Sequence, residues 1–345
     1  MDVIGAALAV DLAWWQSTGI KVAIVLNLIP ATAVLFGYVF LLKMMSHMQS
    51  RLGPMEAGPH GSLQLLADGL KFLQKEDIIP AKADRFVFAA APLVVMLSTF
   101  LLFIVIPAGP DLIVEDLDTG IFFAMAVSSL SVLGILMAGW ASANKYSLIG
   151  ALRAAGQLIA YELPLILAVV GVIVQAGTMS MQGIVVAQAD GEIFGVGLIG
   201  NPYILTQFIG FAIFLIAAQA ELTQAPFDMP VAESELVAGY MTEYTGFRFL
   251  FFFMAEFGTA FAFSAIGATL FLGGWHVPGI EGNLANVVGP IALGIKIMLV
   301  AFLIFWIRFS YPRLREDQLQ TLAWKYLIPL SLVNIAVTGV LKVVF

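Results

Sequence analysis

The sequence predicts an all-α membrane protein, a polytopic bundle of about eight transmembrane helices with an amphipathic helix on its cytoplasmic side. Of its 345 residues, 61% are hydrophobic and only 11% are charged. A soluble domain usually carries about 25% charged residues, and a helix needs about 20 mostly apolar residues to cross a bilayer. The expected spans, of which the fourth and fifth are short, are 20–42, 86–107, 119–141, 159–176, 203–221, 249–273, 289–309 and 326–344.

The composition excludes several other classes of protein. A net charge of −7 leaves no basic footprint for DNA or RNA. The chain has no Cys, so it holds no disulfide, thiolate metal site or iron–sulfur cluster of its own. Its three His residues are scattered, and we predict no metal site. Only Asp2 and Asp11 are charged before Lys21, so the basic region of a cleavable signal is missing and we expect the first span to be retained.

The basic residues predict the orientation of the chain. Thirteen of the 16 Lys and Arg residues lie in or beside the connections that follow odd-numbered spans. They are Lys43, Arg51, Lys71, Lys75, Lys82, Arg85, Lys145, Arg153, Arg248, Arg308, Arg313, Arg315 and Lys325. The positive-inside rule places these connections in the cytoplasm and both termini outside. We expect one integral membrane domain, 1–345, with cytoplasmic loops at about 43–85, 142–158, 222–248 and 310–325.

The first cytoplasmic loop contains a pattern typical of an amphipathic helix, at residues 62–75. Four leucines share one face of this helix and polar residues share the other. The leucines are Leu63, Leu66, Leu70 and Leu73, and the polar residues are Gln64, Asp68, Lys71 and Lys75. Such a helix lies in the membrane interface or packs on the bundle, where it has either a function or a sealing role.

Acidic residues gather in and around the third cytoplasmic loop. Six carboxylates lie between positions 221 and 256, and Arg248 is the only basic residue among them. They are Glu221, Asp228, Glu233, Glu235, Glu243 and Glu256. Glu256 falls about 12 Å into the sixth span, and Glu162 lies at the start of the fourth.

Ionisable groups at bilayer depth cost about 2.5–3.5 kcal/mol on insertion scales, and they usually have a function. We interpret Glu162, Glu221 and Glu256 as parts of a proton pathway or of an acidic gate. An alternative is that Glu256 pairs with Arg248 or with a backbone donor. Lys296, inside the seventh span, either snorkels outward or pairs with a buried acid. Taken alone, three of the loop acids are typical of a solvated loop: Asp228, Glu235 and Glu243.

Four stretches resemble one known family. The sequence APFDMPVAESELVAGYMTEY at 225–244 is similar to the hallmark loop of the quinone-site membrane subunit of respiratory complex I, the H subunit of bacterial NADH–quinone oxidoreductase. The stretches 51–80, 139–164 and 312–330 are similar to the other three cytoplasmic loops of that family, in the same order. The resemblance therefore covers all four cytoplasmic loops and agrees with eight spans.

The resemblance implies the function. In this family the subunit anchors the membrane arm to the peripheral arm and forms much of the tunnel by which a quinone such as ubiquinone enters. Quinone is the substrate, and NADH, FMN and iron–sulfur clusters belong to partner subunits, which fits a chain without Cys. The implied partners are the peripheral-arm quinone-site subunits, small membrane subunits and the lipid of the bacterial inner membrane. Quinone reduction is linked to proton translocation through buried carboxylates.

The implied roles fall on particular residues. The quinone-tunnel candidates match the family's first loop and hallmark loop, and they are Arg51, Asp68, Gly69 and Asp228. The proton-path candidates match the family's membrane acids, and they are Glu162, Glu221, Glu233, Glu235, Glu243 and Glu256. No residue of this chain is expected to be catalytic by itself.

Five positions depart from the family pattern. The usual Glu-Arg before the lysine of the first loop is Leu41 and Leu42 here, which removes two charges from the expected tunnel mouth. The Arg of Gly-Pro-Asn-Arg is reversed in sign as Glu56, the Arg before Ala-Pro-Phe-Asp is Gln224, and the first Glu of Pro-Glu-Ala-Glu is Val231. These changes keep two alternatives open. One is the homologous subunit of a membrane-bound hydrogenase or of a dehydrogenase that uses ferredoxin or another donor. The other is a stand-alone proton- or sodium-coupled transporter.

Overall fold

The computed structural model describes residues 14–191, 200–280 and 282–344, and all regular structure in these ranges is helical. Seven helical stretches are long and apolar enough to cross a membrane, and a shorter apolar helix, α10, joins them. In chain order the spans are α2 (Trp14–Phe36) continued by η1 (Gly37–Met44) and α3 (Met45–Met48), α5 (Arg85–Leu102), α6 (Gly120–Ser128) with α7 (Leu130–Ala141), α8 (Lys145–Ala176), α10 (Phe208–Glu221), α12 (Gly246–Phe271), α13 (Asn283–Ser310), and α14 (Glu316–Thr321) with η5 (Leu322–Leu327) and α15 (Ile328–Val344). The all-α prediction of about eight spans is confirmed.

Three expected boundaries differ from the structure. The last loop, expected at about 310–325, is shorter because α14 begins at Glu316 and continues into η5. The segment 142–158, expected as a loop, is a turn of only a few residues because α8 already begins at Lys145. Small residues let this polar stretch pack as a helix: a side chain at Gly139 of α7 would overlap the Cβ of Ala151 of α8. The Asn144 side chain accepts a hydrogen bond from the Tyr146 backbone and caps the helix. The amphipathic helix is α4 (Gln64–Gln74), slightly shorter than the expected 62–75.

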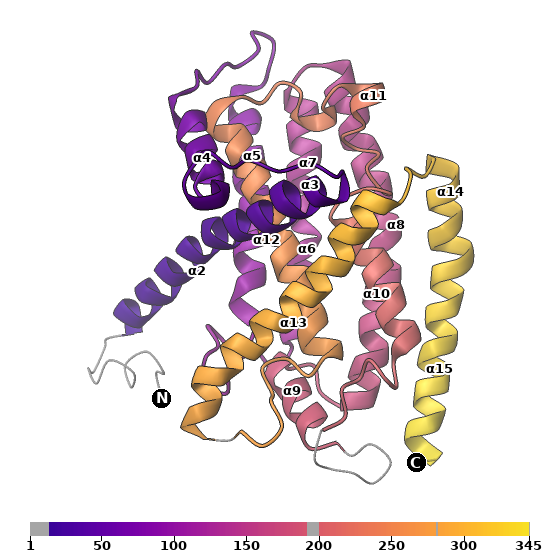
Figure 1. Ribbon diagram of the computed structural model, residues 1–345. Coiled ribbons are helices and arrows are strands. Elements are labelled where there is room, and N and C mark those ends of the chain that lie inside the picture. The colour runs from indigo at the N-terminus through magenta and orange to yellow at the C-terminus, as the bar shows by residue number, and fades with distance from the viewer. Residues whose placement is uncertain (1–13, 192–199, 281, 345) are drawn as a thin grey trace.

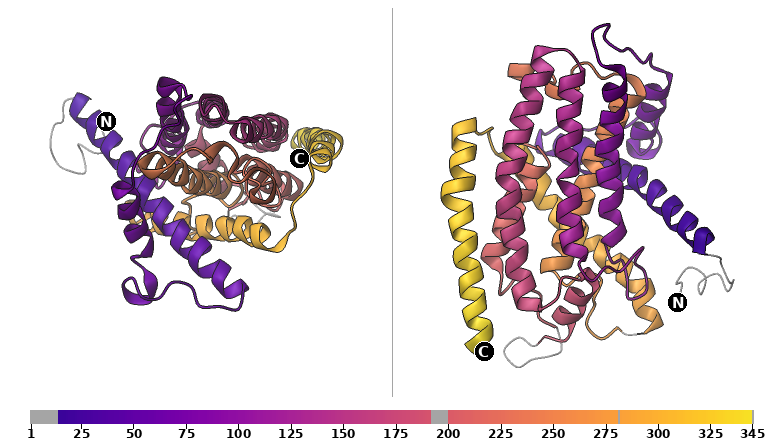
Figure 2. Two further views of the ribbon diagram at one scale, coloured as in Figure 1. Left: turned by 90° about the horizontal axis from the view of Figure 1, so that it is seen from above. Right: turned by 180° about the vertical axis from the view of Figure 1, so that it is seen from behind.

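The spans are arranged around α12. Figure 1 shows α5, α7, α8, α10 and α12 standing nearly upright, while α2 and α13 cross them obliquely and α15 stands at the far edge. The view from above in Figure 2 shows α2 and α13 on the same side of the bundle. Aromatic rings join these two oblique helices to α12. Phe305 of α13 stacks on Phe40 with ring centroids 4.8 Å apart, and it lies 6.1 Å from Phe257 of α12.

The polar connections lie at one end of the bundle. Helix α4 and the short helices α11 (Glu233–Leu236) and η4 (Gly239–Met241) lie there, at the top of Figure 1, where α14 also begins. The opposite end carries α9 (Met181–Ala189) and the connection from α12 to α13. The N-terminal end of α2 and the C-terminal end of α15 also point toward it. The loops that carry the candidate residues therefore share one end of the molecule.

A buried polar cluster fixes α15 to the bundle near the opposite end. Asn334 donates to the Gln207 carbonyl oxygen at 2.8 Å, and the Gln207 amide donates to Thr338 at 2.6 Å. A side chain at Gly171 of α8 would lie 3.1 Å from both Asn334 and Gln207, so the glycine leaves room for the cluster. Hydrogen bonds between helices add to van der Waals packing in holding membrane helices together.

We predict that Asn334→Leu loosens α15. The substitution leaves the buried Gln207 carbonyl oxygen without its donor, which should cost about 1–2 kcal/mol. The measurement is the thermal midpoint of the purified protein in detergent. The matched control is Asn27→Leu, because Asn27 is exposed and bonds only its own helix at Ala23. Equal midpoints for the two variants would contradict the assigned role.

Candidate functional site

Helix α4 carries the first group of candidate residues. Leu63, just before the helix, and Leu66, Leu70 and Leu73 on it are at least half exposed. The inner face packs instead through Leu65, which lies against Gly37 of the first span, and through Phe72, whose ring lies 5.5 Å from that of Phe249 of α12. Asp68 accepts a hydrogen bond from Gln64 at 3.2 Å and lies 3.8 Å from the Lys71 ammonium. A side chain at Gly69 would meet nothing within 4 Å. The helix thus turns an apolar edge outward and keeps its acid at partial exposure.

The loop before α4 is tied to the first span. Tyr38 donates to the His60 carbonyl at 3.1 Å, and Lys43 donates to the Pro54 carbonyl at 2.8 Å. Arg51 is exposed, and its guanidinium bonds Gln49 at 2.8 Å. Lys43, the one charge kept at the start of the first loop, therefore holds the loop to the first span, while Arg51 lies at the surface of the same loop.

Glu162 and Glu221 form an inner acidic pair between α8 and α10. Their charges are close enough to interact. Glu162 accepts a hydrogen bond from Ser129, which lies at the break between α6 and α7. One carboxyl oxygen of Glu221, Oε2, is buried and has no hydrogen-bond partner in the protein. The structure therefore brings these two predicted acids together.

Glu256 has a different partner from the one considered above. Its carboxylate lies 3.5 Å from the guanidinium of Arg308 on α13, and that guanidinium also lies over the Phe305 and Phe309 rings. Arg248 instead pairs with Asp77 at 3.2 Å, in the connection after α4. The alternative in which Arg248 neutralises Glu256 is therefore wrong.

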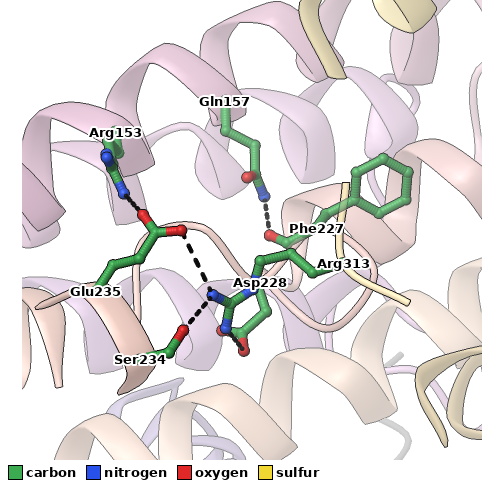
Figure 3. Close-up of polar contacts among 7 residues, drawn as sticks. All are labelled: Arg153, Gln157, Phe227, Asp228, Ser234, Glu235 and Arg313. Atoms are coloured by element: carbon green, nitrogen blue, oxygen red, sulfur yellow. Dashed lines mark hydrogen bonds and ion pairs between the residues drawn. The ribbon is translucent and has the colours of Figure 1, made fainter. Parts of the chain in front are cut away.

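The hallmark loop is held by arginines from two other segments, as Figure 3 shows. Arg313 lies 3.3 Å from Asp228 and 4.0 Å from Glu235, and Arg153 of α8 lies 2.6 Å from Glu235. A polar cavity of about 440 Å³ opens among these groups. The hydrogen bond and charge of Arg153 lower the pKa of Glu235, and the charge of Arg313 lowers it further. Asp228 and Glu235 are thus members of an ion-pair network.

The remaining loop acids lie apart from that network. Glu243 accepts a hydrogen bond from Asn144 at 2.5 Å and lines a separate cavity of about 490 Å³ beside Lys82. The side chain of Glu233 lies outside the described part of the structure. Tyr240 of η4, within the same loop, is buried, and burial, together with the charges of Glu256 and Asp228, raises its pKa.

Several polar residues at the site were missed by sequence reasoning. Gln157, Gln219 and Gln224 are at most 2% exposed, although the first two stand in apolar helices. The sequence contains one signal for Gln157, because a glutamine on a helix face of small residues is expected to be buried. Lys296 adopts neither expected role, because its ammonium donates to the Gly274 and His276 carbonyls at 2.7 and 3.0 Å.

Comparison with known proteins identifies the family. A family model described as NADH dehydrogenase matches residues 20–339. The NADH-quinone oxidoreductase H subunit of Thermomicrobium roseum is 44% identical over 339 residues, which cover 95% of this chain and 97% of that protein. The chain belongs to the family of NADH-quinone oxidoreductase H subunits. The H subunit of Brevibacillus brevis is 46% identical over 313 residues, covering 89% of this chain and 90% of that protein.

Membership of the H-subunit family confirms the resemblance found in the four loops. The H subunit numbered 2 of Syntrophobacter fumaroxidans is also 46% identical, over 307 residues that cover 86% of this chain and 87% of that protein. The departures at Leu41, Glu56, Gln224 and Val231 all fall inside the matched residues, 20–339. They are therefore variations within the H-subunit family.

We predict a pH-dependent effect of Glu235→Gln on stability. Because the folded protein lowers the pKa of Glu235, the carboxylate stabilises the fold above its ordinary pKa of about 4.3. This contribution is lost as the pH falls through the lowered, folded-state value. For a largely exposed pair we expect about 0.2–1 kcal/mol near pH 7. The thermal midpoints of Glu235→Gln and of the unmodified protein should therefore differ at pH 7 and converge once the pH falls below the lowered pKa.

The control for this prediction is Glu56→Gln, a change to an exposed carboxylate in the loop before α4. It should leave the pH dependence of the thermal midpoint as it is in the unmodified protein. If Glu235→Gln shifts the midpoint equally at every pH, the ion pair with Arg153 does not stabilise the fold.

Proposed function

We propose that this chain is the quinone-site membrane subunit of a proton-translocating NADH–quinone oxidoreductase. The observation that carries the proposal is that helix α4 and the ion-paired hallmark loop share one end of the bundle, with the membrane acids in the helices that lead away from it. Relatives named as H subunits, matched over nearly their whole length, support it. That end faces the cytoplasm in the bacterial inner membrane, and both termini lie outside, as the distribution of basic residues indicates.

The quinone enters beneath α4. The exposed leucines of α4 provide an apolar edge that lies in the membrane interface, where an apolar tail can pass from lipid to protein. Asp68, Gly69 and Arg51 belong to this region, with Asp228 further along the tunnel. Reduction to the quinol takes two electrons and two protons. The electrons come from iron–sulfur clusters of partner subunits fed by NADH and FMN, and partner residues supply the groups that protonate the quinone.

Reduction of the quinone is coupled to the membrane acids through the loop 221–248. A change of charge at the quinone repositions this loop, because its carboxylates are held by ion pairs with Arg153 and Arg313. Movement of Asp228 changes the field at Glu256, which it faces. The proton affinities of the membrane acids then change in turn, and protons pass toward the other membrane subunits. The proton-path acids are Glu162, Glu221 and Glu256, with Glu233, Glu235 and Glu243 in the loop.

Leu70→Gln tests the entrance. A polar side chain on the exposed edge of α4 weakens apolar contact with the quinone tail, so the KM for a long-tailed quinone should rise several-fold while kcat changes little. The measurement is steady-state NADH–quinone activity of the assembled complex. Leu205→Gln is the control, since Leu205 is equally exposed, at 63% against 62%, but lies in the connection before α10. An unchanged KM would remove α4 from the entrance.

Glu256→Gln tests the proton path. The variant cannot exchange a proton at this position, so the number of protons translocated per electron should fall at least two-fold in proteoliposomes that contain the assembled complex. Glu115→Gln is the control, because Glu115 pairs with Lys21 in the connection between α5 and α6. Undiminished proton translocation in Glu256→Gln would exclude this residue from the path.

A further inference from the structure

A large apolar cavity lies away from the candidate site, toward the opposite end of the bundle. Its volume is about 680 Å³, within the range of about 300–1,000 Å³ that is usual for ligand pockets. It is lined by α2, by the connection between η3 (Phe103–Val105) and α6, and by α13, together with Phe261 of α12. None of its lining residues belongs to the proposed quinone entrance or proton path.

The two oblique helices each present one face to this cavity. A spacing of three or four residues puts the lining residues of each helix on one side of it. A side chain at Gly294 of α13 would meet nothing within 4 Å, so the glycine leaves this space open. Ile24 and Leu28 of α2 line the cavity and are 50% and 40% exposed. The cavity therefore opens sideways between α2 and α13, at the depth of the apolar spans, where lipid surrounds the protein.

Charged groups gather at the rim of the cavity. Lys21 of α2 donates to Glu115 at 3.1 Å, and Asp111 accepts a hydrogen bond from Asn286 of α13 at 2.9 Å. These two bonds tie the connection before α6 to both oblique helices. The side chains of Lys21 and Glu115 are 27% and 57% exposed, so a molecule at the rim can reach them. With Asp116, the rim carries one ammonium group and three carboxylates.

The lining changes from charged to apolar with depth. Leu28 lies about 10 Å farther along α2 than Lys21 does. Phe261 lies ten residues before the end of α12, which is about 15 Å from that end. Water is a poor occupant of the inner part, because apolar cavities stay dry. An acyl chain instead gains dispersion contacts with the surrounding side chains. A charged rim above an apolar interior matches a molecule with a polar head and an apolar tail.

We propose that this cavity binds a zwitterionic phospholipid of the phosphatidylethanolamine class, with one acyl chain between α2 and α13. Lys21 donates to the phosphate, and Glu115 and Asp116 accept from the ammonium of the head group. The three carboxylates of the rim repel an anionic lipid, which has no positive group to offset them. A choline head group carries the positive charge but has no N–H donor for a carboxylate. The site goes beyond the proposed function and does not depend on it.

Cross-linking tests where the acyl chain lies. The assembled complex is reconstituted in phosphatidylcholine vesicles with a trace of phosphatidylethanolamine that carries a diazirine at the end of one acyl chain. Illumination should label Phe103 or Phe261, inside the cavity. Gly294→Phe fills the cavity and should lower this labelling at least three-fold. Gly339→Phe is the matched control, because Gly339 of α15 also has nothing within 4 Å of an added side chain. Equal labelling in the two variants would overturn the inference.

The composition of the vesicles tests the head group. Replacing about half of the phosphatidylcholine with unlabelled phosphatidylethanolamine should lower the labelling of Phe261 at least three-fold, because the unlabelled lipid competes for the site. The same amount of phosphatidylglycerol should leave the labelling unchanged. Equal competition by the two lipids, or competition by added quinone instead, contradicts the assignment.

Lys21→Met tests the phosphate contact. The variant keeps an unbranched side chain without its charge, and it should lower the labelling of Phe261 at least three-fold. Lys342→Met is the control, because Lys342 is an exposed lysine near the end of α15 and donates to the Val174 carbonyl. If Gly294→Phe fails to assemble, Lys21→Met and the vesicle series decide the matter. Labelling in Lys21→Met equal to that of the control shows that Lys21 does not hold the lipid, and a structure of the complex with a protein segment inside the cavity overturns the site.

Discussion

Charged side chains in an apolar bundle must have partners nearby, and in this protein α13 and the loop after it supply them. Arg308 lies against Glu256 of α12, and five residues later Arg313 lies against Asp228 and Glu235. Removal of Arg308 would leave the Glu256 carboxylate without its partner at bilayer depth, where an ionisable group costs about 2.5–3.5 kcal/mol on insertion scales. The oblique course of α13 therefore has a structural consequence: it places Arg308 beside Glu256 and leads the chain to Arg313, beside Asp228 and Glu235.

The same oblique packing determines where α4 lies. Phe36 and Phe40 of the first span pack against Phe305 of α13, which fixes the direction of the first span. The loop that follows is tied back to this span through Tyr38 and Lys43. Helix α4 then packs on α12 through Phe72 while its outer leucines remain exposed. An aromatic cluster in the core thus sets the position of the surface on which the proposed quinone entrance depends.

The sequence predicted the fold more completely than it predicted the contacts of the site. Spans and polar loops follow from local composition, because a bilayer requires about 20 apolar residues for each crossing. Segment 142–158 was expected as a loop because Arg153 and Gln157 lower its hydropathy, yet small residues let it pack as the start of α8. Helical geometry could have excluded Arg248 as the partner of Glu256. Eight residues separate them by about 12 Å along the axis, whereas Arg308 comes from a distant part of the chain.

The ion-pair network also shows how a small movement of the hallmark loop can act on Glu256. Asp228 faces both Glu256 and Tyr240 and is held by Arg313 at 3.3 Å, while the second contact of Arg313, to Glu235, is longer at 4.0 Å. With an effective dielectric constant of about 20, moving a unit charge from about 4 to about 8 Å changes an interaction by about 2 kcal/mol. That energy corresponds to a change of about thirty-fold in proton affinity. A shift of a few ångströms in one carboxylate is therefore sufficient to load or release a proton, provided that the loop has two stable positions.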